Sequence, residues 1–246
     1  MSKVRLWVVM SITTVLIACN FTEEIYLEDN GSGKISIAFD GSELMQMAGS
    51  EMGGMPEEKA IDSVMHFKDF LAQHKDSIAQ LSAEEQAKLK RLEPFSLHMV
   101  MNQESQEMKF DLYSEFKDLS EVTDVFSAFN EASTLGPKAQ GSMSATPSTS
   151  ESTQVDYSFT DRTFKRKVTI LDETLHQQSI DSLQSMEMFL SNSTYTLKYH
   201  FPKKVKKASA ENATYSADGK TLIYSVNFIE YMKNPQLLDL EVELEK

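Results

Sequence analysis

Methionine thioethers near the N-terminus are the side chains whose type and spacing most clearly suggest chemistry. Met45, Met47, Met52 and Met55 lie within eleven residues, in Met-x-Met and Met-Gly-Gly-Met spacings. Thioethers are soft ligands that suit Cu(I). Methionine is also a flexible filler of cores and of adaptable apolar surfaces. The segment 45–55 therefore predicts either a Cu(I) site or an apolar surface for packing or for a greasy ligand.

Catalytic motifs are not found elsewhere in the chain. It contains no Gly-x-Ser-x-Gly, His-Glu-x-x-His, phosphate-loop or Gly-x-Gly-x-x-Gly sequence. Its 37 carboxylates make chance pairs certain, so a pair of acids carries no information without geometry. We therefore expect a protein that is not an enzyme, with no cofactor and no catalytic residues. No metal-ligand spacing relates the five histidines, which are His66, His74, His98, His176 and His200.

Alternating and helical patterns predict the elements that would position these residues in the first half. Residues 24–39 read as a β-hairpin, because two alternating runs flank the turn residues 29–33. Residues 57–81 have apolar residues at helical spacings, and Ser82 begins a capping box for a second helix. Strands are predicted at 95–101 and 108–113, and a core-facing helix at 118–132.

Residues 134–153 interrupt this periodicity. Ser, Thr, Gly, Pro and Ala dominate the segment, which predicts a flexible loop or linker. The chain then divides into residues 1–18, a first half at 19–133, the linker at 134–153, and a second half at 154–246. The second half has strand patterns, a helix capped by Asp172, and a final alternating run at 238–244. The two halves could form one domain or two.

Hairpin-joined strands with a few amphipathic helices favour an α+β fold. We expect a mainly antiparallel sheet with amphipathic helices packed on one face. Strict alternation of strand and helix is missing, which counts against a doubly wound parallel fold.

The first eighteen residues have the layout of a secretory signal. Lys3 and Arg5 form a charged start, and an apolar run fills 6–18. That run spans about 20 Å, which is short of the roughly 30 Å hydrocarbon core of a bilayer. We therefore expect export rather than a permanent transmembrane helix.

The end of this run, Leu16-Ile17-Ala18-Cys19, resembles the lipobox of bacterial lipoproteins, and Cys19 is the only cysteine in the chain. The resemblance implies a signal peptide at 1–18, a diacylglyceryl group on the Cys19 sulfur, and acylation, typically with palmitate, of the new N-terminus. Several acyl chains anchor a protein stably to a membrane. The body would resemble the small envelope lipoproteins of Gram-negative bacteria. Glu23 and Glu24 either resemble the acidic tether of surface-exposed lipoproteins in Bacteroidota or begin the first strand.

Charge limits the partners. Loss of Lys3 and Arg5 with the leader would change the formal net charge from −13 to −15, which argues against nucleic acid. The sequence thus predicts a lipid-anchored protein of the cell envelope, on the outer membrane in preference to the inner one. We expect a non-enzymatic binding or envelope-assembly module. An apolar ligand, a scaffolding role with an envelope protein, and Cu(I) binding remain alternatives.

Overall fold

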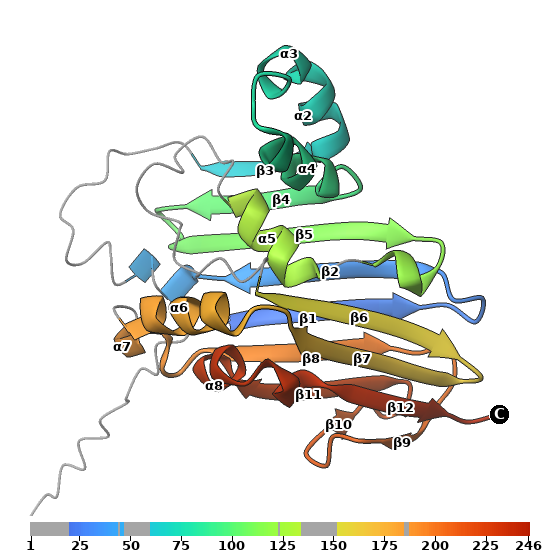
Figure 1. The fold of residues 1–246 in the computed structure, drawn as a ribbon. Coiled ribbons are helices and arrows are strands. Elements are labelled where there is room, and N and C mark those ends of the chain that lie inside the picture. Colours follow the sequence, from blue (N-terminus) through green and yellow to red (C-terminus); the bar gives the residue numbers. More distant parts are fainter. Residues whose placement is uncertain (1–19, 44, 47–59, 123, 134–151, 185–186) are drawn as a thin grey trace, which may run out of the picture.

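The computed structural model describes residues 20–43, 45–46, 60–122, 124–133, 152–184 and 187–246. Within these residues the protein is mainly sheet and partly helical, with one large sheet, one small sheet and several short helices (Figure 1). The strands of the large sheet are, in spatial order, β10 (Thr214–Tyr215), β11 (Thr221–Asn227), β8 (Thr194–His200), β1 (Asn20–Leu27), β2 (Gly33–Asp40), β5 (Glu107–Phe116), β4 (Ser96–Asn102) and β3 (Ile61–His66).

The large sheet is mixed. Strands β1 and β8 are parallel neighbours, and the other neighbouring pairs are antiparallel. Because β8 follows residue 153 and β1 precedes residue 134, strands from both halves of the chain share this sheet. The predicted hairpin is confirmed as the pair β1–β2. Its turn uses Gly31 at a φ of 84°, a conformation that suits glycine.

One prediction for the first half was wrong. Residues 61–66 fit a helical pattern but form β3, which pairs antiparallel with β4 along its whole length. The β-branched residues Ile61 and Val64 suit a strand, and pairing at the sheet edge overrides the local helical spacing. The helix α2 (Phe67–Gln73) begins only after the strand, where the Phe67 amide donates to the Phe95 carbonyl at 3.1 Å.

The small sheet packs over one face of the large sheet and encloses the core between them (Figure 1). The predicted alternation of 238–244 is confirmed, since Leu240, Val242 and Leu244 are all buried in β12. All neighbouring strands of the small sheet are antiparallel. Their order is β6 (Thr153–Thr160), β7 (Thr163–Ile170), β12 (Leu240–Leu244) and β9 (Val205–Ala208).

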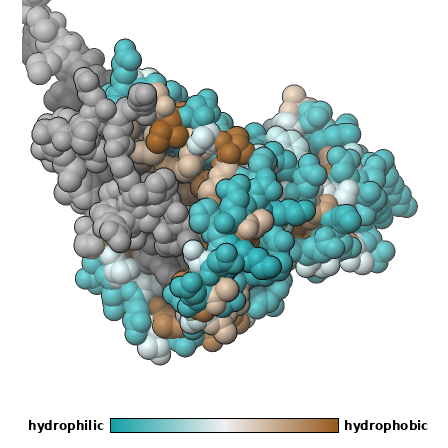
Figure 2. All heavy atoms as spheres, turned by 90° about the horizontal axis from the view of Figure 1, so that it is seen from above, coloured by the Kyte–Doolittle hydropathy of each residue, from teal (hydrophilic) through white to brown (hydrophobic). Residues whose placement is uncertain are grey.

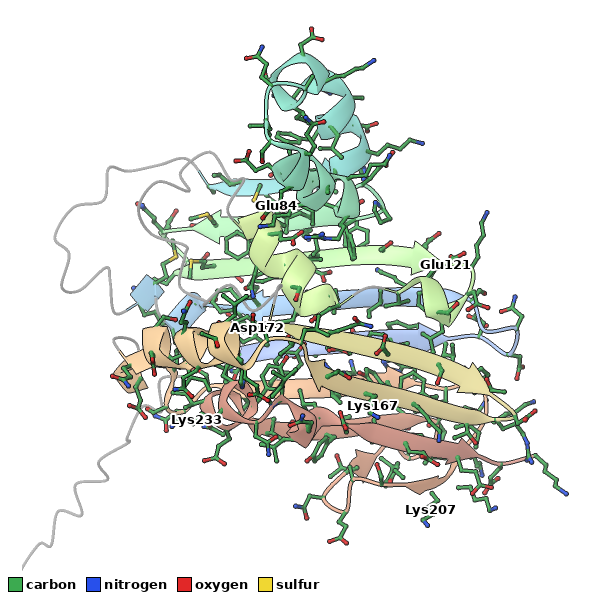
Figure 3. The ribbon with its side chains drawn as sticks, in the orientation of Figure 1. Glu84, Glu121, Lys167, Asp172, Lys207 and Lys233 are labelled. Carbon is green, nitrogen blue, oxygen red and sulfur yellow. The ribbon has the colours of Figure 1, made fainter. Side chains whose placement is uncertain are left out.

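Helices cover the core face beside the small sheet and extend the β3 edge of the large sheet (Figure 1). Local side chains set the starts of two of these helices. Ser82 makes both bonds of a capping box with Glu85, at the start of the helix that begins at Ala83. Asp172 accepts from two amides in the first turn of the helix that begins at Glu173. Glu84 and Asp172 mark these helix starts in Figure 3. Beside α2, the helices are α3 (Lys75–Ile78), α4 (Ala83–Arg91), α5 (Val125–Ser133), α6 (Glu173–Leu183), α7 (Glu187–Leu190) and α8 (Phe228–Lys233).

In the part of the chain that the structure describes, each helix is too short or too polar to cross a bilayer. Seen from above, the described surface is mostly hydrophilic with scattered hydrophobic residues, in keeping with the acidic net charge (Figure 2). Few large apolar side chains of the described residues are exposed; examples are Val64 at 49% and Ile61 at 38%.

Candidate functional site

The outer face of the large sheet, opposite the core, carries the candidate binding site. Along β1 the side chains alternate, so that Phe21 and Ile25 are buried in the core while Thr22 lies on the outer face. Strand register aligns Thr22 with Ala38 of β2, and Ala38 with Asp111 of β5. The small side chains of Thr22 and Ala38 leave room beside Asp111.

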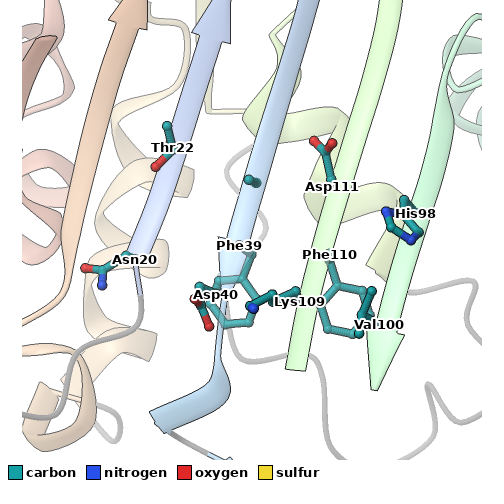
Figure 4. Close-up of a pocket in the computed structure, with 10 residues that line it drawn as sticks. Asn20, Thr22, Phe39, Asp40, His98, Val100, Lys109, Phe110 and Asp111 are labelled. Atoms are coloured by element: carbon teal, nitrogen blue, oxygen red, sulfur yellow. The ribbon is translucent and has the colours of Figure 1, made fainter. Parts of the chain in front are cut away.

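A pocket of about 450 Å³ occupies this part of the outer face (Figure 4). It crosses four adjacent strands at the end of the sheet where β1 begins. Six of its ten lining residues have side chains that donate or accept hydrogen bonds, and they are set in a lining surface that is mostly apolar. The lining residues are Asn20, Thr22, Ala38, Phe39, Asp40, His98, Val100, Lys109, Phe110 and Asp111.

Asp111 is the most unusual residue of this pocket. Its Oδ1 is buried and has no hydrogen-bond partner in the structure. Burial raises the pKa of Asp111, and the nearby Lys34 and His98 only partly offset that effect. Lys34 is not a direct partner, because its Nζ lies over the Tyr113 ring at 4.5 Å from the centroid. A buried carboxylate oxygen without a partner is costly, so the partly buried Asp111 calls for a ligand or solvent partner.

The other charged residues of the pocket already have partners. His98 Nε2 lies 2.8 Å from Asp62 Oδ1 on β3. Lys109 Nζ lies 2.8 Å from Glu107 Oε1, in a pair that is exposed on both sides. Asp40 accepts from the Ser42 amide at 3.0 Å through one oxygen. Lys109 and Glu107 have opposite charges that offset each other, so Asp40 and Asp111 give the pocket a negative charge.

A second polar cluster is buried between the two sheets. Glu23 of β1 and Arg166 of β7 form an ion pair, with side chains 1% and 0% exposed. Arg166 donates through Nε and Nη2 to the two carboxylate oxygens at 3.2 and 3.1 Å, and through Nη1 to the Leu238 carbonyl at 3.2 Å. The same carboxylate accepts hydroxyl bonds at 2.5–2.8 Å from Tyr157, Tyr195 and Tyr199.

This cluster is structural in character. Burial by itself raises the pKa of Glu23, but Arg166 and the tyrosine hydroxyls outweigh burial and lower it. Every partner comes from the fold and the ion pair is buried, so the cluster fixes how the sheets dock and offers no position to a substrate. Sequence reasoning missed Glu23 and Arg166. The sequence does contain a signal for Glu23, because this charged residue lies between Phe21 and Ile25 on the same, apolar face of the strand.

The structure places few of the residues that the sequence singled out. Cys19, Met47, Met52 and Met55 lie outside the described residues, as does 134–151 of the predicted linker. Met45 is described, and its amide donates to the Gly41 carbonyl at 3.0 Å. Glu23 and Glu24 belong to β1 and so do not form a tether. Within the described residues, no group of three or more His, Cys, Asp or Glu side chains could hold a metal ion.

The histidines are not brought together into one site. His98 lines the pocket, whereas His200 contacts Glu24 at 2.7 Å on the same sheet face. His66 pairs with the Ser96 hydroxyl at 2.7 Å, and His74 with the Phe70 carbonyl at 2.8 Å. His176 is buried in α6.

Sequence reasoning did not find the pocket, because it depends on the registers of four strands from distant parts of the sequence. Comparisons of this chain with models of protein families, with curated proteins and with solved structures find no match.

Proposed function

We propose that this protein is a lipid-anchored, non-enzymatic binding module of the cell envelope. The proposed anchor is acylated Cys19, and the proposed location is the outer membrane. A body with its helices and small sheet on one face of the large sheet leaves the opposite face for a ligand. The pocket's hydroxyl, amide and charged groups would bind the polar part of a ligand.

One observation supports this proposal above all others: the sheet begins directly after the lipobox cysteine. Cys19 closes the Leu-Ile-Ala-Cys sequence, and Asn20 is already the first residue of β1. Consecutive Cα atoms are about 3.8 Å apart, so an anchor on Cys19 would have no spacer. The acyl chains would then hold the Asn20 end of the large sheet at the membrane surface.

The strand that carries this anchor is well suited to it. β1 is a central strand, paired with β2 on one side and β8 on the other. Its Glu23 is held by Arg166 of the small sheet. An acyl anchor on this strand would therefore orient the whole body rather than a loose terminal segment.

The anchor is tested by expressing the full chain in a Gram-negative host with an alkyne analogue of palmitate. We expect the wild-type chain to take up the label, to lose residues 1–18, and to sediment with membranes. Cys19→Ala should remain an unlabelled, uncleaved precursor. A matched leader variant outside the lipobox, Thr13→Ala, should be processed like the wild type. Efficient cleavage of Cys19→Ala to a soluble product, or an unlabelled wild-type chain, would refute the proposal.

A further inference from the structure

Asp111 indicates what kind of group the pocket takes. The Oδ1 atom of its carboxylate is buried and has no hydrogen-bond partner. A carboxylate accepts hydrogen bonds and donates none, so the complementary ligand group is a donor. Such a donor would replace the hydration that the carboxylate loses on burial.

The remaining charges favour a positively charged donor over a neutral hydroxyl. His98 Nε2 lies within hydrogen-bond distance of Asp62, and Lys109 pairs with Glu107, so neither side chain bonds to Asp111. Asp40 lies on the neighbouring strand, where its register partner is Lys109, and adds a second carboxylate to the lining. A carboxylate strengthens the hydrogen bond from any donor, but only a cationic donor is also attracted by the charge of two carboxylates, so an ammonium group fits this pocket best.

Exposed aromatic rings are absent from the lining of the pocket, which favours a primary over a quaternary ammonium group. Quaternary ammonium groups are recognised by the open faces of aromatic side chains. The aromatic residues that line the pocket, Phe39 and Phe110, are only 8% and 6% exposed and belong to the core. The pocket therefore suits a primary ammonium, whose N–H groups can bond to carboxylates.

Lys109 adds a site for a negative group on the same ligand. Lys109 and Asp111 lie two residues apart on one face of β5, at a separation of about 7 Å. The exposed pair of Lys109 with Glu107 is worth little and can be exchanged for a better partner. A positive and a negative subsite side by side match a small zwitterion with an ammonium and a phosphate.

The position of the pocket indicates the source of this zwitterion. Asn20, which follows Cys19, lines the pocket together with Asp40 and Lys109 at the same end of the sheet. We propose that the pocket binds the phosphoethanolamine headgroup of a membrane lipid, with the ammonium at Asp111 and the phosphate at Lys109. The membrane source of the ligand rests on the proposed function, whereas the zwitterion chemistry rests on the pocket alone.

The proposal is tested by calorimetric titration of the purified full chain in detergent micelles free of amines. Three soluble probes separate the alternatives: glycerophosphoethanolamine, glycerophosphocholine and ethylammonium. We expect glycerophosphoethanolamine to bind at least about tenfold more tightly than either of the others, because each lacks one of the two matched groups. Equal binding of ethylammonium and glycerophosphoethanolamine would overturn the headgroup assignment.

Three variants locate the binding. Asp111→Asn should weaken glycerophosphoethanolamine binding about tenfold or more. Lys109→Met should weaken binding of that probe but leave ethylammonium unchanged. Asp156→Asn removes the same charge from an exposed position on β6 and should bind like the wild type. Wild-type affinity in Asp111→Asn would overturn the proposal. Loss of acylation at Cys19 would refute the anchor and leave these titrations unchanged, so the two failures are distinguishable.

Discussion

Replacing Arg166 by methionine tests how the two sheets are held together. The substitution keeps much of the side-chain volume but leaves the Glu23 carboxylate in the core without its counter-charge. Removing one partner of a buried ion pair typically costs about 3–5 kcal/mol. Since a domain of this kind is stable by only about 5–15 kcal/mol, we expect Arg166→Met to be severely destabilised.

The pH dependence of stability distinguishes this mechanism from a simple packing defect. In the wild type the pKa of Glu23 is lowered despite its burial. Its stabilising contribution is therefore present above the ordinary pKa of glutamate and is lost as the pH falls through the folded value. In Arg166→Met burial is no longer offset, so the pKa of Glu23 rises. Folding of this variant should become more favourable as the pH falls from 7 to 5.

Urea denaturation followed by circular dichroism at both pH values measures these differences. The double variant Glu23→Gln/Arg166→Met should be more stable at pH 7 than Arg166→Met, because the unpaired charge is gone while the amide oxygen still accepts from the tyrosines. The reasoning is refuted if Arg166→Met loses less than about 1 kcal/mol at pH 7. A parallel pH dependence in Arg166→Met and the wild type would also contradict it.

Three further substitutions test local features of the fold by the same denaturation assay. Asp111→Asn should stabilise the ligand-free protein by about 1 kcal/mol at pH 7. Because burial raises the pKa of Asp111, this gain should shrink as the pH falls and the wild-type carboxyl becomes protonated. A loss of stability at pH 7 would contradict this reading. Ser82→Ala should cost about 1 kcal/mol by removing the capping box of α4, and no change would show that the cap is unimportant. Gly33→Ala should cost about 1–3 kcal/mol, because its Cβ would lie 2.0 Å from the Tyr26 carbonyl oxygen; an unchanged midpoint would exclude that clash.

Features set by neighbouring residues could be predicted from the sequence. The β1–β2 hairpin follows from alternation on both sides of a glycine-containing turn. The cap at Ser82 and the N-cap at Asp172 follow from side chains that bond to amides within the same turn. In each case the interaction lies within a few residues, so the local pattern contains the information.

Features set by distant pairing could not be predicted in this way. The parallel pair β1–β8 joins Phe21 to Tyr195 across more than half the chain. The strand at 61–66 depends on β4 being available as a neighbour, which its own helical spacing does not reveal. The pocket likewise depends on the register that brings Ala38 beside Asp111. Such sites become visible only when the strand order is known.

The central claim is that an anchor on Cys19 holds the Asn20 end of the large sheet at the membrane. A single new cysteine, labelled with a fluorophore in the acylated chain, can report its distance from nitroxide lipids in vesicles. Glu104 lies in the β4–β5 turn at the Asn20 end, whereas Asp29 follows β1 at the opposite end, about 24 Å along the strand. We predict strong quenching of a label at Glu104→Cys and weak quenching at Asp29→Cys. Equal quenching at the two positions, or stronger quenching at Asp29→Cys, would contradict the claim.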